Sequence, residues 1–279
     1  MSEIELSGTV NTRDVGGLPL ADGEGKVRDG VLIRSDNLQD LTDADVHRLV
    51  DDLHVKRVVD LRTGVELRGT GPGRLDGVQG VRVDHLSLFP EVGATTDAPV
   101  DDTDGDARPD ILPWARKQGE RRRAEPEDDV RGWSDTPVAR VYLRYLVQRP
   151  DSIVAALRDI AEAADEGGAT IVHCAAGKDR TGTVVALALD LVGVDRAAIE
   201  QDYLATVPNA AAILDRLVNT TTYHDDVADT RAEDHAPRAG TMPAVLASVD
   251  RYFGGTAAFL AGHGWTDEDT ARLRRALIG

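Results

Sequence analysis

The chain has 279 residues, of which 32 are Lys or Arg and 49 are Asp or Glu, so its formal net charge is −17. This charge argues against nonspecific binding to nucleic acid or to an anionic membrane, because both are polyanions, but it does not exclude a small local basic pocket. The single cysteine excludes an intrachain disulfide and favours a reducing compartment. Hydrophobic residues make up 41% of the chain, enough for a core, and the length favours one large domain over residues 1–279.

The N-terminus carries no basic and apolar leader of the secretory kind, and no apolar run reaches the roughly 18 residues that span a bilayer. We therefore expect no integral membrane association. The expected location is the cytoplasm, or the exterior by export without a classical signal peptide.

Short apolar runs in the first third of the chain, and one later run, predict strands over 30–35, 56–61, 81–88 and 169–174. Residues 1–30 are rich in Gly and Asp, which predicts loops with one short hairpin. An amphipathic helix is predicted over 41–55, with Thr42 as its N-cap.

The composition changes at about residue 90. From 90 to 137 the chain holds polar, proline-containing charge blocks without an apolar period. We expect an insertion that is partly flexible or belongs to a lid, and a solvated loop without a role is an equal alternative.

Helical spacing dominates the rest of the chain. Helices are predicted over 137–149, 152–166, 181–194, 195–206, 209–219, 242–255, 256–264 and 266–278, the last with Thr266 as its N-cap. A polar stretch, 220–241, interrupts them. Strands that alternate with helices predict an α/β fold with a small, mostly parallel central sheet flanked by helices.

The sequence HCAAGKDRTG, residues 173–182, joins the last predicted strand to a helix expected to begin near Thr181 or Gly182. Backbone N–H groups at a helix N-terminus bind anions, and the small side chains of Ala175, Ala176 and Gly177 leave that approach open. Arg180 can give two parallel hydrogen bonds to a phosphate. The same field favours a thiolate, and cysteines so placed have pKa values of roughly 3.5–7.5 instead of about 8.5. The turn therefore combines a nucleophile, Cys174, with an anion clamp. The alternative is an inert buried thiol.

This loop resembles the His-Cys-x5-Arg-Ser/Thr loop of the cysteine-dependent protein tyrosine phosphatases. It is most similar to the bacterial tyrosine/serine phosphatases with GKDRTG, which include secreted phosphatases of mycobacteria and Listeria. The segments NTRDVGG (11–17), VVDLRTGVEL (58–67) and the C-terminal residues 252–277 also resemble that family. The resemblance covers nearly the whole chain outside 90–137, and it implies the phosphatase fold with a helical lid, which we expect at about 209–240.

The resemblance also implies roles. Cys174 would attack phosphorus and form a cysteinyl-phosphate, while Thr181 would hydrogen-bond the sulfur. His173 would orient the loop. The phosphate would be bound by the loop residues Ala175, Ala176, Gly177, Lys178, Asp179 and Arg180. Lys178 could add charge for doubly phosphorylated or inositol substrates, and Asp179 could order the loop or handle a proton.

A general acid must protonate the leaving oxygen. The resemblance points to Asp60, at the carboxyl end of a predicted strand, where sites of α/β proteins lie. Asp179 is the second choice, and Asp135 in GWSD (132–135) is the third, because it resembles a mobile Trp-Pro-Asp loop. Arg13, Asp14 and Arg62 are expected to contact substrate, support the site from behind or form structural salt bridges.

Other classes fit less well. In a nucleotide-binding P-loop, Val172 would be a glycine, and Asp179 would not follow the lysine. The thiol relay of an arsenate reductase needs further cysteines. His224 and His235 lie among carboxylates, but the family needs no metal, and we expect neither metal nor cofactor.

The expected function is hydrolysis of phosphomonoesters, on phosphotyrosine and also on phosphoserine, phosphothreonine or phosphoinositides. The expected partners are thus phosphoproteins or phosphoinositides. The alternative is a non-hydrolysing phosphate or phosphoinositide reader on the same fold. The sequence leaves the oligomeric state open.

Overall fold

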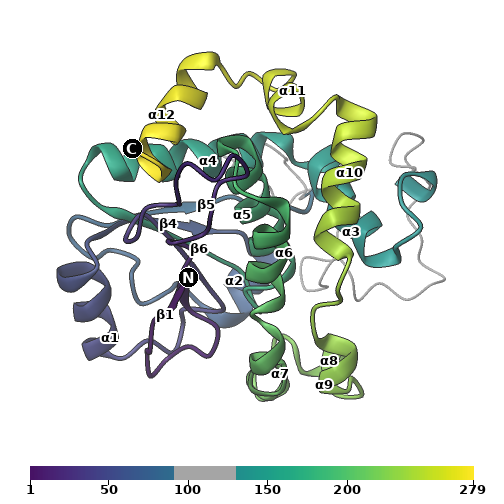
Figure 1. Ribbon diagram of the computed structural model, residues 1–279. Coiled ribbons are helices and arrows are strands. Elements are labelled where there is room, and N and C mark those ends of the chain that lie inside the picture. Colours follow the sequence, from purple (N-terminus) through teal and green to yellow (C-terminus); the bar gives the residue numbers. More distant parts are fainter. Residues whose placement is uncertain (91–129) are drawn as a thin grey trace, which may run out of the picture.

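The computed structural model describes residues 1–90 and 130–279 (Figure 1). Most of the expected insertion at 90–137 therefore lies outside the described residues. Its last part forms the short turn η2 (Val130–Gly132), where Val130 is buried, and leads into α3.

The described strands form one six-stranded sheet. They are β1 (Ser2–Glu3), β2 (Arg13–Asp14), β3 (Leu32–Ser35), β4 (Val55–Asp60), β5 (Arg82–His85) and β6 (Ala169–His173). The helices before β6 are α1 (Asp43–His47), η1 (Arg48–Asp52), α2 (Gly64–Thr70), α3 (Pro137–Gln148) and α4 (Pro150–Asp165). The helices after β6 are α5 (Asp179–Val192), α6 (Arg196–Leu204), η3 (Val207–Asn209), α7 (Ala210–Val218), α8 (His224–Val227), α9 (Ala232–His235), α10 (Thr241–Phe253), α11 (Thr256–Ala261) and α12 (Asp267–Leu277).

The strand order is β1-β2-β3-β6-β4-β5, and β3, β6, β4 and β5 run parallel while β1 and β2 are antiparallel. The expected α/β fold with a mostly parallel sheet is confirmed. In the register, His173 lies opposite Ser35 on one side and Asp60 on the other. The carboxyl ends of three strands therefore meet at one edge of the sheet, directly before the predicted loop.

Helices cover both faces of the sheet, with α1 on one side and α4, α5 and α12 on the other (Figure 1). Successive strand residues alternate between two apolar clusters, as the two-residue period of a strand requires. In β4, for example, Val58 belongs to the cluster under α1 and Val59 to the larger cluster under α5. Helix α5 is buried over almost its whole length, which places the loop before it in the middle of the molecule.

The N-caps at Thr42 and Thr266 are confirmed, and each forms a capping box with an aspartate three residues on. One helix boundary needs correction, and two segments hold short helices that the apolar spacing did not predict. Helix α5 begins at Asp179, earlier than expected, because the amide of Gly182 already bonds the carbonyl of Lys178. The polar stretch 220–241 holds the short helices α8 and α9. Helix α2 was not expected, although Thr63 and Glu66 form a capping box at its start.

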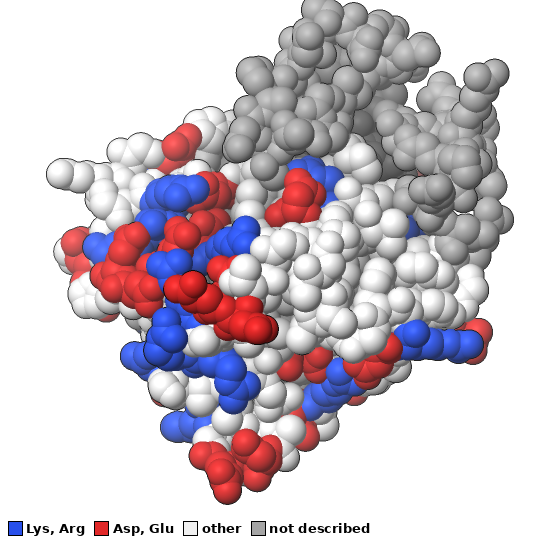
Figure 2. Space-filling model, turned by 90° about the horizontal axis from the view of Figure 1, so that it is seen from above, with Lys and Arg blue, Asp and Glu red and all other residues white. Residues whose placement is uncertain are grey.

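The face that carries α12 shows acidic and basic side chains side by side (Figure 2). Ion pairs there include Arg272 with Asp165 and Arg158 with Asp269. Within the described parts of the chain, no helix is both long enough and apolar enough to cross a membrane.

Candidate active site

The predicted loop lies between β6 and α5, as expected, with Cys174 at the end of the strand and 2% exposed. Ala175 and Ala176 are buried with it. Gly177 has φ +64°, and a Cβ atom there would lie 2.5 Å from the carbonyl oxygen of Ser35. Only glycine fits this position, because the loop lies directly on the end of β3.

Arg180, in the first turn of α5, is held by α2. Its two terminal nitrogens donate to the two carboxylate oxygens of Glu66 at 2.6 and 2.9 Å, and one also donates to the carbonyl of Leu61 at 3.1 Å. Burial acts to lower the pKa of Arg180, but Glu66 outweighs it and raises the pKa well above the usual value. The guanidinium is therefore a fixed cation with a set direction, which suits an anion clamp.

Thr181 and His173 flank the same turn. The hydroxyl of Thr181 is fully buried and has no hydrogen-bond partner in the part of the chain that the structure describes. This hydroxyl can therefore donate a hydrogen bond to the sulfur of Cys174. His173 lies with Nε2 3.6 Å from an oxygen of Asp60. Burial lowers the pKa of His173 to about 4, so its imidazole is neutral at pH 7.

Lys178 and Asp179 form the rim of the loop, 3.6 Å apart, and the Asp179 side chain is 32% exposed. Tyr142 of α3 donates its hydroxyl proton to Asp179, so Tyr203 must donate to Tyr142 across their 2.8 Å contact. Burial acts to raise the pKa of Asp179, but Lys178 and Tyr142 outweigh it and lower the pKa below the usual value. The carboxylate of Asp179 is oriented from α3 and remains accessible.

Asp60 lies at the end of β4, and both oxygens of its carboxylate already accept hydrogen bonds from Arg62. Arg62 donates to it with its backbone amide and with two guanidinium nitrogens. Burial acts to raise the pKa of Asp60, and His173 and Arg62 together outweigh it and lower the pKa far below the usual value. Both residues are buried, so they form a closed ion pair behind the loop.

Arg13 and Asp14 are neighbours in β2, but their side chains make different contacts. Arg13 is buried beneath the loop and donates to the carboxylate of Asp202 at 3.0 Å. Asp14 accepts hydrogen bonds from the amides of Gly16 and Gly30, which stabilises the turns around β2. In the described structure Asp14 makes no hydrogen bond or ion pair with the loop.

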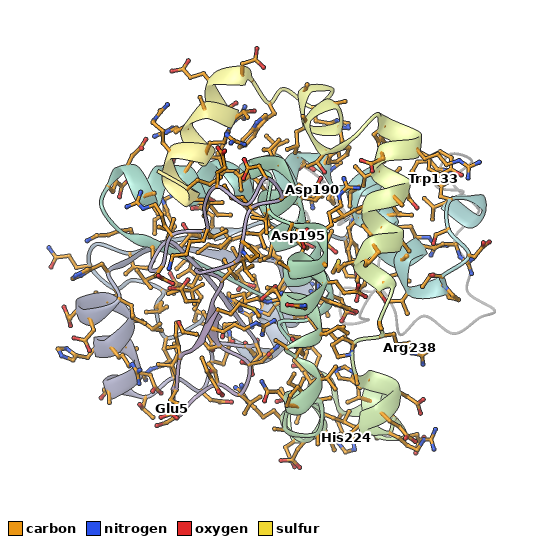
Figure 3. All side chains as sticks on the ribbon, viewed as in Figure 1. Glu5, Trp133, Asp190, Asp195, His224 and Arg238 are labelled. Atoms are coloured by element: carbon orange, nitrogen blue, oxygen red, sulfur yellow. The ribbon has the colours of Figure 1, made fainter. Side chains whose placement is uncertain are left out.

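The remaining candidates lie elsewhere. Asp135 is exposed before α3. Trp133, two residues earlier, lies near α10 (Figure 3) and stacks on Tyr252 of that helix. His224 begins α8, and its Nδ1 donates to the nearby carbonyl of Val218. Among the described residues there is no group of three or more His, Cys, Asp or Glu side chains that could hold a metal ion.

Helices α7, α8 and α9, here called the cover helices, lie side by side at one end of the molecule (Figure 1). Ile213 and Leu217 of α7, with Tyr223 before α8, form one apolar cluster with Ala175 and Ala176 of the loop. The Tyr223 hydroxyl donates to Glu66 at 3.1 Å.

The cover helices also make polar contacts. Lys178 donates to the carbonyl of His235, and Arg216 pairs with Asp36. Burial, with Lys178 adding to it, lowers the pKa of His235 to about 4. Together with the bond from Tyr223 to Glu66, these contacts connect this part of the chain both to the loop and to the partner of Arg180.

Several residues around the loop were not among the sequence candidates: Asn11, Arg34, Glu66, Tyr142, Asp202 and Tyr223. Two of them carried a usable signal. Glu66 is the fourth residue of a capping box, and Asn11 opens the NTRDVGG segment. The others reach the loop only through the tertiary fold.

The chain is similar to known phosphatases over its whole length. The model of the tyrosine phosphatase family matches residues 4–279. The triple specificity protein phosphatase PtpB of Mycobacterium tuberculosis (strain ATCC 25618 / H37Rv) is 30% identical over 296 residues, with 100% of both chains covered. A tyrosine-protein phosphatase of Nostoc commune is 33% identical over 124 residues, 40% of each chain. The crystal structure of P. aeruginosa TpbA has 19% identity and covers 79% of this chain and 87% of its own, but its TM-score of 0.28 supports no argument about fold.

Proposed function

Because the chain belongs to the tyrosine phosphatase family, we propose that it hydrolyses phosphomonoesters at Cys174 through a cysteinyl-phosphate. One observation carries this assignment: Cys174 and Arg180 lie at the two ends of a loop that wraps the N-terminus of α5. Such a loop binds a phosphate with its amides, and Arg180 adds a fixed cation.

The reaction has two steps. The Cys174 thiolate attacks phosphorus, an S–P bond forms, the P–O bond breaks, and the leaving oxygen takes a proton from an aspartic acid. Water then attacks phosphorus and gives a proton to the same carboxylate. The S–P bond breaks, and inorganic phosphate and the thiolate are released. Thr181 supports this departure by donating its hydroxyl to the sulfur.

We assign the proton transfer to Asp179 rather than to Asp60. Asp179 is accessible at the loop rim, and Tyr142 fixes one of its oxygens. An arriving phosphate dianion raises the pKa of a neighbouring carboxylate, which favours the protonated form that the first step needs. Asp60 is buried with both oxygens bonded to Arg62, and it supports His173 from behind.

Two variants separate these assignments. Asp179→Asn is expected to lower kcat about 100-fold on alkyl phosphates and much less on aryl phosphates with good leaving groups, because only a poor leaving group needs the proton. Asp60→Asn is expected to affect both substrates equally. If Asp60→Asn produces the dependence on leaving group and Asp179→Asn does not, the assignment is reversed.

The substrates are proposed to be phosphotyrosine proteins and, at the same site, phosphoserine, phosphothreonine and phosphoinositides. PtpB, the relative that matches over its full length, is named a triple specificity phosphatase. Lys178 at the rim supports this breadth, since it adds a cation beside the loop that can meet a second phosphate. A panel of kcat/KM values on phosphopeptides and phosphoinositides tests the proposal.

The basic experiment measures turnover of an aryl phosphate in the presence of a metal chelator. Wild type is expected to turn over and to be inhibited by vanadate, while Cys174→Ser is expected to bind phosphate without turnover. A wild type that binds phosphate but does not hydrolyse the ester would support the non-hydrolysing reader instead.

We further propose that the cover helices are a lid that opens for substrate and shields Cys174 when closed. Three features support this: the apolar contact with Ala175 and Ala176, the few polar contacts, and the 2% exposure of Cys174. Shielding matters because a single-cysteine chain has no resolving thiol for an oxidised Cys174. A reducing compartment stays a prediction from the same cysteine count.

A further inference from the structure

The loop rests on a buried polar cluster that the roles above do not use. Its members, here called the floor cluster, are Asn11, Arg13, Arg34 and Asp202. Arg34 is 0% exposed and Asp202 is 1% exposed. These residues come from the N-terminal segment, from β2, from β3 and from α6, so the sheet and one helix together assemble the cluster.

Hydrogen bonds link the four residues of the floor cluster to one another and to the loop. Asn11 donates its side-chain amide to the carbonyl of Ala176 at 3.0 Å, and Arg34 donates to the carbonyl of Gly177 at 2.7 Å. Arg13 donates to the side-chain oxygen of Asn11 at 2.9 Å. Asp202 accepts from both arginines, so it ties Arg13 and Arg34 together.

These contacts set the direction of the loop amides. In a trans peptide the carbonyl of one residue and the N–H of the next point in opposite directions. The described chain has no cis peptide. The carbonyl of Ala175 accepts from the amide of Asn37, just after β3, at 3.2 Å. With the carbonyls of Ala176 and Gly177 directed at the floor cluster, the N–H groups of the residues that follow, Gly177 and Lys178, point to the opposite side.

The floor cluster also carries charge. Two arginines share one carboxylate, which leaves a net positive charge directly beneath a loop that binds an anion. Burial and the neighbouring Arg34 lower the pKa of Arg13 only to about 10, so Arg13 stays charged at neutral pH. A buried charge is weakly screened, and its field therefore acts on the phosphate above.

We infer that Asn11 and Arg34 are positioning residues of the phosphatase reaction: they hold the carbonyls of Ala176 and Gly177 so that the loop amides face the phosphate, and Arg34 adds positive potential from below. This inference rests on the proposed function of Cys174. Neither residue touches the substrate. Their effect is to prepare, before substrate arrives, the donors that stabilise the charge of the transition state.

The test uses two assays and a matched control. Inorganic phosphate binding is measured by calorimetry in the Cys174→Ser background, and kcat and KM are measured on an aryl phosphate with Cys174 intact. The variants are Asn11→Ala and Arg34→Lys, which keeps the charge but not the fork geometry. The control is Arg57→Lys, because Arg57 pairs with Glu166 near the other end of the sheet.

Asn11→Ala is expected to lower kcat and phosphate affinity by about 10- to 100-fold, in the range found when an outer support of a site is removed. Arg34→Lys is expected to lose about 10-fold in kcat with a smaller change in KM, and Arg57→Lys to stay within about twofold of wild type. If Asn11→Ala folds poorly, the isosteric Asn11→Asp replaces it and is expected to lose at least as much, because it presents an acceptor to the Ala176 carbonyl.

A folded Asn11 variant with wild-type kcat and phosphate affinity would overturn the inference. The phosphatase assignment is judged separately. A wild type without turnover, whose phosphate binding still weakens in the Asn11 variants, would remove the hydrolysis and leave the positioning role in place.

Discussion

The phosphate loop is held from two sides by regions of very different construction. The floor cluster joins β2, β3 and α6 through buried, charged hydrogen bonds. The cover helices are short. They meet the loop through a small apolar cluster and the bond from Lys178 to the carbonyl of His235, and Tyr223 beside them bonds Glu66 of α2. One side is part of the sheet, while the other packs on the loop and is tied to its surroundings by Arg216, which pairs with Asp36, and by the bond of Tyr223 to Glu66.

This difference matches two demands of the chemistry. The amides must keep one direction in every step of the reaction, and a network with several mutually dependent bonds achieves this. Substrate must also enter, and a surface with few contacts separates at low cost. We therefore propose that the loop stays fixed from beneath while the cover helices open above it.

The largest expected effect comes from breaking the floor cluster. Asp202→Asn removes the negative charge between Arg13 and Arg34 and leaves two buried cations without a counterion. The free energy of unfolding, measured by urea denaturation, is expected to fall by about 3–5 kcal/mol.

The control on the cover side is Asp40→Asn. Asp40 pairs with Arg216 of α7, but its side chain is 70% exposed. The expected loss is within about 0.5 kcal/mol, because exposed ion pairs contribute little. If Asp202→Asn and Asp40→Asn lose the same free energy of unfolding, the floor cluster is not more strongly held together than the cover helices.

The next effect is a pH dependence of stability that comes from the buried His173 at the end of β6. Burial lowers the pKa of His173 to about 4, against the opposing charge of Asp60, while the unfolded chain has the ordinary value of about 6.5. Between these values the unfolded state binds more protons, so stability falls as the pH falls. His173 is expected to account for about 2 kcal/mol of loss between pH 7 and pH 5.

Denaturation of wild type and of His173→Asn at both pH values measures this contribution. The variant is expected to lose less stability on acidification than wild type does. If the two proteins lose the same amount, burial of neutral His173 is not the cause.

The smallest effect concerns the cover helices. Tyr223→Phe removes the hydrogen bond to Glu66 that ties the cover to the partner of Arg180. Loss of a bond to a charged group is expected to favour opening and to raise the alkylation rate of Cys174 by iodoacetamide roughly 10-fold. Tyr252→Phe is the control, because Tyr252 of α10 donates to the carbonyl of Gly132 in η2, away from the loop. Equal alkylation rates in the two variants would contradict a lid.

Local signals in the sequence predicted the alternation of strands and helices, the turn at Cys174 and the N-caps at Thr42 and Thr266. Each of these depends on residues close in sequence, through side-chain period or a hydrogen bond over three residues. The order of the strands is not local. It brings Asn11 to Ala176 across 165 positions, and Glu66 to Arg180 across 114.

The sequence by itself thus determined the fold class and the loop that carries the proposed nucleophile and clamp, because the loop motif is contiguous and the periods are local. The surroundings of the loop follow only from the tertiary structure. There, Arg62 donates hydrogen bonds to the carboxylate of Asp60, Tyr142 orients Asp179, and a buried cluster supports the loop. The physical reason is that such contacts depend on which strands lie side by side and which helix covers them, and no short stretch of the chain encodes that order.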